Sequence, residues 1–210
     1  MKNRFITQIK FAGVLLATAM FVAFSTAVHG QSAGGFLRIA DFPKEENLST
    51  PKVPQKKHEA VRNYMMHEAR TLKNMGYHVE MMRDGEVMVI TIGASELFEP
   101  NETSLIEKGQ KKLDTLLAYL KKENRFKMIL VMHTDDTGSP EYLYDLSEMR
   151  LDAVSSYLKS HALYPGQIAG YAMGSSEPLF TNNTRSNREN NRRLEIYIVP
   201  DEELITNLRK

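Results

Sequence analysis

Residues 127–158, KMILVMHTDDTGSPEYLYDLSEMRLDAVSSYL, join a short apolar run to a longer helical pattern through a polar loop. The run 127–132 is almost wholly apolar, which is typical of a buried strand. Over 142–158 the apolar side chains recur at helical spacing and form one stripe, with Arg150 in its middle. We therefore expect a strand and a helix that pack together, with the loop 133–138 at the carboxyl end of the strand.

Arg150 requires an explanation, because a guanidinium on the face that meets the core is costly unless it is paired or opens onto a cleft. A structural salt bridge is one explanation, and a recognition site is the other. Asp135 and Asp136 follow the apolar strand and supply candidate anions, at the strand end where open α/β sheets usually bind ligands. The residues alone leave the choice between these two carboxylates open.

The patterns on either side predict an amphipathic helix, a hairpin, another helix and two more strands: residues 57–74, 77–82 and 86–92 with a turn at Asp84-Gly85, 105–120, 167–172 and 193–199. Ser104 and Glu107 have the spacing of a capping box at the start of the helix over 105–120. Strands interleaved with helices imply one sheet with helices packed against it. We predict an α/β fold (an α+β sandwich), a mixed sheet with a βαβαβ core that is preceded by an extra helix and a β-hairpin.

Charge and cysteine content exclude several classes of function. The chain has 210 residues, with 27 Lys and Arg against 26 Asp and Glu, so no bulk field favours nucleic acid as a partner. Arg192 and Arg193 lie near Arg185 and Arg188, but no aromatic platform accompanies them, and we interpret them as a solvated helix and strand end. The absence of cysteine excludes disulfides, thiolate metal sites, a cysteine nucleophile and a lipid-modified cysteine.

The N-terminal residues predict export. A basic start and the apolar run 11–28 precede small residues before Gln31, which is the pattern of a signal peptide over 1–30. The alternative is an uncleaved membrane anchor, because the apolar run is close to the lower limit for spanning a bilayer. The expected organisation is a signal peptide (1–30), a linker (31–55), a helix and hairpin (56–95), a ligand-binding domain (96–200) and a tail (201–210).

Catalytic constellations are not evident. His58-Glu59 and His67-Glu68 begin like a zinc-protease motif, but neither has a second histidine four residues on. His133, beside two aspartates, is more simply explained as a structural histidine at the end of a buried strand. We therefore predict no catalytic residue, no metal and no cofactor, and hence no enzyme.

Three blocks of residues resemble the OmpA C-terminal domain family over residues 97–199, about half of the chain. They are 98–105, then His133-Thr134-Asp135-x-x-Gly138 with Leu146-Ser147-x-x-Arg150, and finally Gly170-x-x-x-Gly174-x-x-x-Pro178 leading to Asn191-Arg192-Arg193-Leu194-Glu195. The middle block is specific, because its Asp and Arg stand fifteen positions apart with Leu-Ser at the expected offset. The resemblance implies the OmpA-like mixed sheet and a module that binds peptidoglycan without turnover.

In that family, the residue that matches Asp135 takes the ammonium of a diaminopimelate side chain, and the residue that matches Arg150 takes its carboxylate. By the same resemblance, Thr134 and Asn101 are expected to assist. One fixed anion and one fixed cation suit the zwitterionic head of a free amino acid. Leu143 and Asn187 depart from the family pattern, which usually has Asn and Gly there, and the change at Leu143 puts fine selectivity in doubt.

The resulting expectation is a periplasmic protein that tethers or organises the cell wall, with outer-membrane association left open. Its expected partner is peptidoglycan, while other envelope proteins and a homodimer through 57–92 stay open. One alternative is a stator-like inner-membrane protein that keeps 11–28 as an anchor, although this segment lacks the intramembrane carboxylate of proton-driven proteins. A cell-wall hydrolase is the other alternative.

Overall fold

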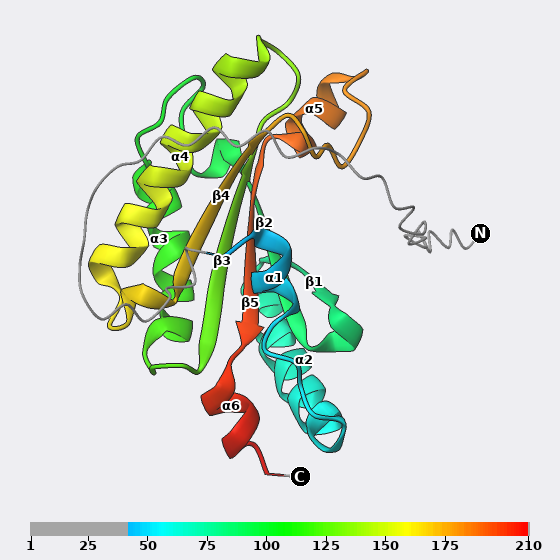
Figure 1. Ribbon diagram of the computed structural model, residues 1–210. Coiled ribbons are helices and arrows are strands. Elements are labelled where there is room, and N and C mark those ends of the chain that lie inside the picture. The colour runs from blue at the N-terminus through cyan, green and yellow to red at the C-terminus, as the bar shows by residue number, and fades with distance from the viewer. Residues whose placement is uncertain (1–41, 210) are drawn as a thin grey trace, which may run out of the picture. The chain divides into compact units, whose positions relative to one another are not determined.

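A five-stranded mixed sheet forms the centre of the molecule (Figure 1). The computed structural model describes residues 42–209, so the expected signal peptide and the first part of the linker lie outside the described residues. The strands are β1 (His78–Met82), β2 (Val87–Gly93), β3 (Phe126–His133), β4 (Ile168–Gly174) and β5 (Arg193–Pro200), in the order β1-β2-β5-β3-β4. β3 and β4 are parallel, and the other neighbours are antiparallel. The predicted mixed α/β fold is confirmed.

Six α-helices accompany the sheet: α1 (Lys44–Ser49), α2 (His58–Asn74), α3 (Glu107–Leu116), α4 (Pro140–His161), α5 (Arg185–Asn191) and α6 (Glu202–Asn207) within residues 42–209. Short 3-10 turns join them at Gln55–Lys57, Arg83–Gly85, Ala94–Glu96, Leu117–Leu120 and Pro165–Gln167. Within residues 42–209, none of these helices is both long and apolar enough to cross a bilayer.

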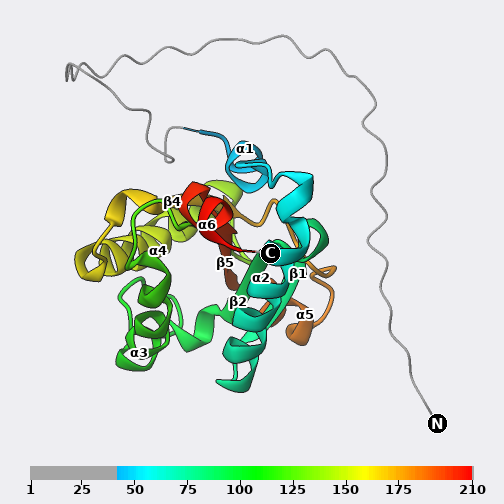
Figure 2. The same cartoon turned by 90° about the horizontal axis from the view of Figure 1, so that it is seen from below.

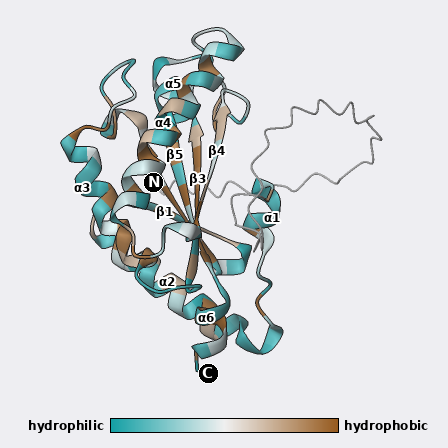
Figure 3. Cartoon of the chain, turned by 60° about the vertical axis from the view of Figure 1, so that its left-hand side comes forward, coloured by the Kyte–Doolittle hydropathy of each residue, from teal (hydrophilic) through white to brown (hydrophobic). Residues whose placement is uncertain are grey.

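One face of the sheet carries the main core. Leu194, Ile196 and Ile198 of β5 are fully buried there together with the apolar sides of α2, α3 and α4. Figure 3 shows the apolar interior of the sheet and the polar outer surfaces of the helices. This arrangement follows from the alternating pattern of β5 and the helical stripes, since each element buries its apolar side against the other.

The opposite face is covered by α1 and the chain around it (Figure 2). Asn47 is 2% exposed and its amide donates to Tyr171 Oη (2.7 Å), while Lys127 Nζ donates to Asn47 O (3.0 Å). This short helix lies inside the segment for which we expected a linker without regular structure. A helix of six residues is too short to show a period, and its position here depends on tertiary contacts.

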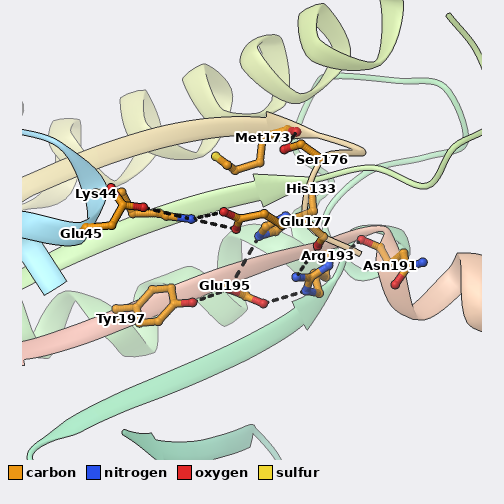
Figure 4. Close-up of polar contacts among 10 residues, drawn as sticks. All are labelled: Lys44, Glu45, His133, Met173, Ser176, Glu177, Asn191, Arg193, Glu195 and Tyr197. Carbon is orange, nitrogen blue, oxygen red and sulfur yellow. Dashed lines mark hydrogen bonds and ion pairs between the residues drawn. The ribbon is translucent and has the colours of Figure 1, made fainter. Parts of the chain in front are cut away.

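A buried polar cluster lies on the same face (Figure 4). Glu195 accepts from Arg193 Nε (2.7 Å) and from Tyr197 Oη (2.5 Å), and His133 Nε2 lies 3.6 Å from its Oε2. Burial alone would raise the pKa of Glu195, but these three neighbours outweigh it and lower the pKa to about 2. Arg193 is only 3% exposed, so the interpretation of this arginine as solvated is wrong.

The expected capping box at Ser104 is also wrong. Helix α3 begins at Glu107, with Ile106 in the N-cap position and no side-chain cap. Leu105 instead forms an isolated antiparallel bridge with Phe98. The expected C-terminal tail contains α6, whose Leu204 and Ile205 are buried in the main core.

Candidate ligand-binding site

A pocket of about 500 Å³ lies at the carboxyl end of β3. Four segments line it: the loop over 94–101, the loop over 134–137, the first part of α4, and α5 with the residue after it. Asp135, Arg150, Thr134 and Asn101 all line this one pocket. The structure thus brings together all four residues predicted from the sequence.

The loop after β3 is shaped by local hydrogen bonds. Thr134 N–H donates to Gly174 O (2.8 Å), which extends the parallel pairing with β4 by one residue. Gly138 has a φ of +149°, a backbone conformation that residues other than glycine rarely adopt. Ser139 then caps α4 by accepting from Tyr142 N–H (3.2 Å), and Pro140 starts the helix. The chain therefore turns from strand to helix within a few residues and leaves Asp135 inside the turn.

Asp135 is 5% exposed, whereas Asp136 is exposed and does not line the pocket. The carboxylate of Asp135 accepts from Thr137 N–H at Oδ1 (2.9 Å) and forms an ion pair with Arg192 through Oδ2. Burial alone would raise its pKa, but the hydrogen bond from Thr137 and the guanidinium of Arg192 lower the pKa below the usual value. The loop at the end of β3 therefore supplies the pocket with an anionic group, the carboxylate of Asp135.

Arg150 contacts the protein on one side, and part of its guanidinium has no hydrogen-bond partner among the described residues. Its Nε–H donates to Glu102 O (2.9 Å), and its guanidinium lies 5.0 Å from the ring centroid of Phe98. Burial lowers the pKa of Arg150, and the nearby Arg192 lowers it further. Its two Nη groups make no hydrogen bond to any residue within 42–209, and the side chain lines the pocket. An arginine has enough donors to bind a carboxylate with these groups.

Ser147 fixes the helix that carries Arg150. Its hydroxyl donates to Tyr144 O (2.7 Å) and accepts from Gly174 N–H (3.0 Å) at the end of β4. A Cβ at Gly174, where φ is +50°, would lie 3.2 Å from Tyr144 N, so glycine permits this close approach. The Leu-Ser pair seen in the sequence thus sets the position of α4, and Arg150 follows Ser147 by three residues, on the neighbouring turn.

Thr134 and Asn101 both line the pocket. Thr134 is 3% exposed, and its hydroxyl donates to Asp135 O (2.9 Å). Asn101 is exposed and has a φ of +62°, a left-handed conformation that Asn tolerates better than most residues. Their roles in binding stay predictions.

Arg192 and Arg188 also line the pocket, and the sequence did not mark either of them as a binding residue. The sequence favours a solvated cation at Arg192, but this residue pairs with Asp135 and has a side chain that is 39% exposed. Its position depends on the antiparallel pairing of β5 with β3, in which Leu194 lies opposite Met132. The one available signal was its place in the Asn191-Arg192-Arg193 block of the family resemblance.

Residues 42–209 contain no group of three or more His, Cys, Asp or Glu side chains that could hold a metal ion. Both ring nitrogens of His133 lack a hydrogen-bond partner among these residues, and Glu195 Oε2 lies 3.6 Å from its Nε2. The groups in the pocket that can act on a ligand are therefore charges and hydrogen-bond donors, led by Asp135, Arg150 and Arg192.

Comparison with known proteins gives consistent matches. A model of the OmpA family matches residues 97–192. Outer membrane protein A of Bordetella avium is 31% identical over 110 residues, which cover 52% of this chain and 57% of that protein. The peptidoglycan-associated lipoprotein of Buchnera aphidicola subsp. Baizongia pistaciae is 31% identical over 101 residues, covering 48% and 58%. The matched part is thus less than two thirds of either relative.

Among solved structures, a MotB-like protein from Desulfovibrio vulgaris has the same fold. It superposes with a TM-score of 0.61 at 21% identity, over 70% of this chain and 99% of that chain. The match extends beyond the residues of the family model.

Proposed function

Residues 97–192 belong to the OmpA family, and from this we propose that the protein binds peptidoglycan in the cell envelope without turning it over. The ligand is the free head of a diaminopimelate stem peptide, whose ammonium binds Asp135 and whose carboxylate binds Arg150. The observation that carries the proposal is that one buried anion and one buried cation line the same pocket of about 500 Å³.

The charges of the pocket favour a zwitterion. A crosslinked stem has no free ammonium and an amidated stem has no free carboxylate, so either ligand leaves one desolvated charge of the protein without a partner. Each charged hydrogen bond contributes about 1.5 to 3 kcal/mol. Two such contacts give weak binding to one stem, and many copies on a polymeric wall strengthen it through avidity.

Two further pocket residues are proposed to assist in ligand binding. Thr134 stabilises the loop that carries Asp135 by donating to Asp135 O, and Asn101 contributes a side-chain amide to the lining of the pocket. Leu143 is 3% exposed and lines the pocket where the family usually has Asn. We therefore expect this wall to contact the aliphatic part of the ligand and to add little polar selectivity.

The names of the relatives support a location in the envelope, since one is an outer membrane protein and the other is a peptidoglycan-associated lipoprotein. We propose that this chain is exported and acts in the periplasm, where it tethers or organises the wall. An intact mass that corresponds to a chain starting at or near Gln31 would agree with cleavage of the signal peptide. A mass that includes residues 1–30 would favour the stator-like alternative.

Co-sedimentation with purified sacculi tests the proposal. We expect the wild-type protein to pellet with sacculi, and Asp135→Ala and Arg150→Ala to lose most of that binding. Asp136→Ala is the matched control, because it removes the adjacent carboxylate, which is exposed and outside the pocket. Circular dichroism must show that each variant is folded, since removing one partner of a buried charge pair can destabilise a fold. Undiminished pelleting of folded Asp135→Ala and Arg150→Ala would overturn the proposal, and release of soluble fragments would favour a hydrolase.

A further inference from the structure

We propose that the guanidinium of Arg192 occupies the site on Asp135 that the ammonium of a ligand would take. Once a ligand displaces this guanidinium, Arg192 binds a second carboxylate of that same ligand. The inference rests on the proposed function and narrows its ligand class. The preferred ligand presents one ammonium and two carboxylates, as does a diaminopimelate residue at the end of a peptide. A stem that continues beyond this residue, or one amidated there, lacks the second carboxylate.

Both carboxylate oxygens of Asp135 already have hydrogen-bond donors. Oδ1 accepts from Thr137 N–H (2.9 Å), and Oδ2 pairs with Nη1 of Arg192. The side chain of Asp135 is 7% exposed, which leaves little room for a further cation beside these donors. A ligand ammonium must therefore take the place of the guanidinium.

The side chain of Arg192 can leave Asp135 at low cost. Its side chain is 39% exposed, and the only hydrogen bond that this side chain makes within residues 42–209 is to Asp135. Its backbone is fixed separately, because its N–H donates to Arg188 O (3.1 Å) and its carbonyl accepts from Ala94 N–H (2.9 Å). The side chain can thus rotate while the backbone stays in place, and an exposed arginine is readily solvated.

The pocket carries an excess of positive charge. Three guanidinium groups, from Arg150, Arg188 and Arg192, line it against two carboxylates, from Glu99 and Asp135. A zwitterion adds no net charge, so it leaves this excess of positive charge unchanged. A ligand with a second carboxylate neutralises it and provides a partner for the displaced Arg192. The lowering of the Arg150 pKa by Arg192 agrees with two cations that lie within electrostatic range.

Arg188 is less suited than Arg192 to bind the second carboxylate. Its Nη1 donates to Asn182 O (2.7 Å), which ties the side chain to the loop before α5. Arg192 has no such second attachment among the described residues, so it is the guanidinium that a ligand can recruit.

Isothermal titration with two synthetic peptides tests the inference. Both end in diaminopimelate with a free ammonium and a free distal carboxylate, and they differ only in whether the main-chain carboxylate is an acid or an amide. We expect the wild-type protein to prefer the acid about tenfold. In Arg192→Met this preference should fall to near unity. The amide peptide should bind this variant more tightly than it binds the wild type, because the ammonium of the peptide no longer competes with a guanidinium for Asp135.

Two control variants accompany the titration. Arg185→Met removes the same charge from the exposed start of α5, outside the pocket, and should retain the wild-type preference. Arg192→Lys keeps a cation and should retain part of the preference. An unchanged tenfold preference in folded Arg192→Met would overturn the inference.

The inference and the proposed function can fail separately. Equal binding of both peptides by the wild type, with loss of binding in Asp135→Ala and Arg150→Ala, would overturn the role of Arg192 and leave the proposed function standing. Absence of binding to either peptide, together with undiminished pelleting of Asp135→Ala and Arg150→Ala on sacculi, would overturn both.

Discussion

Glu195 is a buried acid whose partners lower its pKa to about 2. Arg193, Tyr197 and His133 surround its carboxylate on the face of the sheet that α1 covers. The same residues adjoin the pocket in sequence, since His133 precedes Thr134 and Arg193 follows Arg192. The charge pairs beneath the sheet therefore help to hold the two strand ends that carry pocket residues.

Glu195 should make stability depend on pH in the acid range. Its pKa is lowered from 4.5 to about 2, so its ionised form stabilises the fold above about pH 4.5, and this contribution is lost as the pH falls toward 2. The shift corresponds to about 3 kcal/mol at neutral pH. Urea unfolding between pH 7 and pH 2.5 should show this loss in the wild type, and Glu195→Gln should be less stable at pH 7 and less pH-dependent. Glu45→Gln is the control, since that side chain is 79% exposed, and equal pH dependence of wild type and Glu195→Gln would contradict the assignment.

At the scale of single residues, the sequence predicted the burial of side chains whose position follows from helical phase. It did not predict contacts that depend on pairing between distant strands. Arg150 stood out because its phase places a charge on the buried stripe, and it is buried as expected. Asp135 could be chosen over Asp136 only through the family resemblance, and the structure separates them by burial. Arg192 was missed because its contact with Asp135 spans 57 positions.

Among the elements, long periodic segments were predicted well and short ones were missed. The helices α2 and α4 and all five strands lie where hydrophobic periodicity placed them, within a few residues at their ends. The helices α1 and α6, which the sequence patterns did not predict, have six residues each. Helices of this length are not stable by themselves and form here through tertiary contacts, so their sequences carry no clear period.

Ser147 links α4 to β4 and should affect both stability and binding. Ser147→Ala removes the acceptor for Gly174 N–H and leaves a buried donor without a partner, which should cost about 1 to 3 kcal/mol. Because Arg150 follows three residues later on the same helix, binding to sacculi should also weaken. Ser156→Ala on the exposed side of α4 is the matched control. Thermal melts and pelleting that are the same for both variants would show that this link does not position the helix.

For the whole molecule, the sheet separates two kinds of surface. One face packs α2, α3 and α4 into the main core, while α1 and its flanking chain cover the other through polar contacts such as the ion pair Lys44–Glu177 (2.5 Å). The pocket lies at one end of the sheet, where β3 and β5 bring Asp135 and Arg192 together. Binding can therefore be tested on the intact protein with charge changes that leave both packed faces untouched.

The central claim is that Arg150 binds the carboxylate of a diaminopimelate head, and the choice between two kinds of sacculi tests it most directly. Lysine-type peptidoglycan offers a side-chain ammonium without that carboxylate, whereas diaminopimelate-type peptidoglycan offers both. We expect the wild-type protein to bind diaminopimelate-type sacculi at least about tenfold more tightly, and Arg150→Met to lose this preference. Equal binding of the wild type to both kinds of sacculi, or an unchanged preference in folded Arg150→Met, would contradict the account.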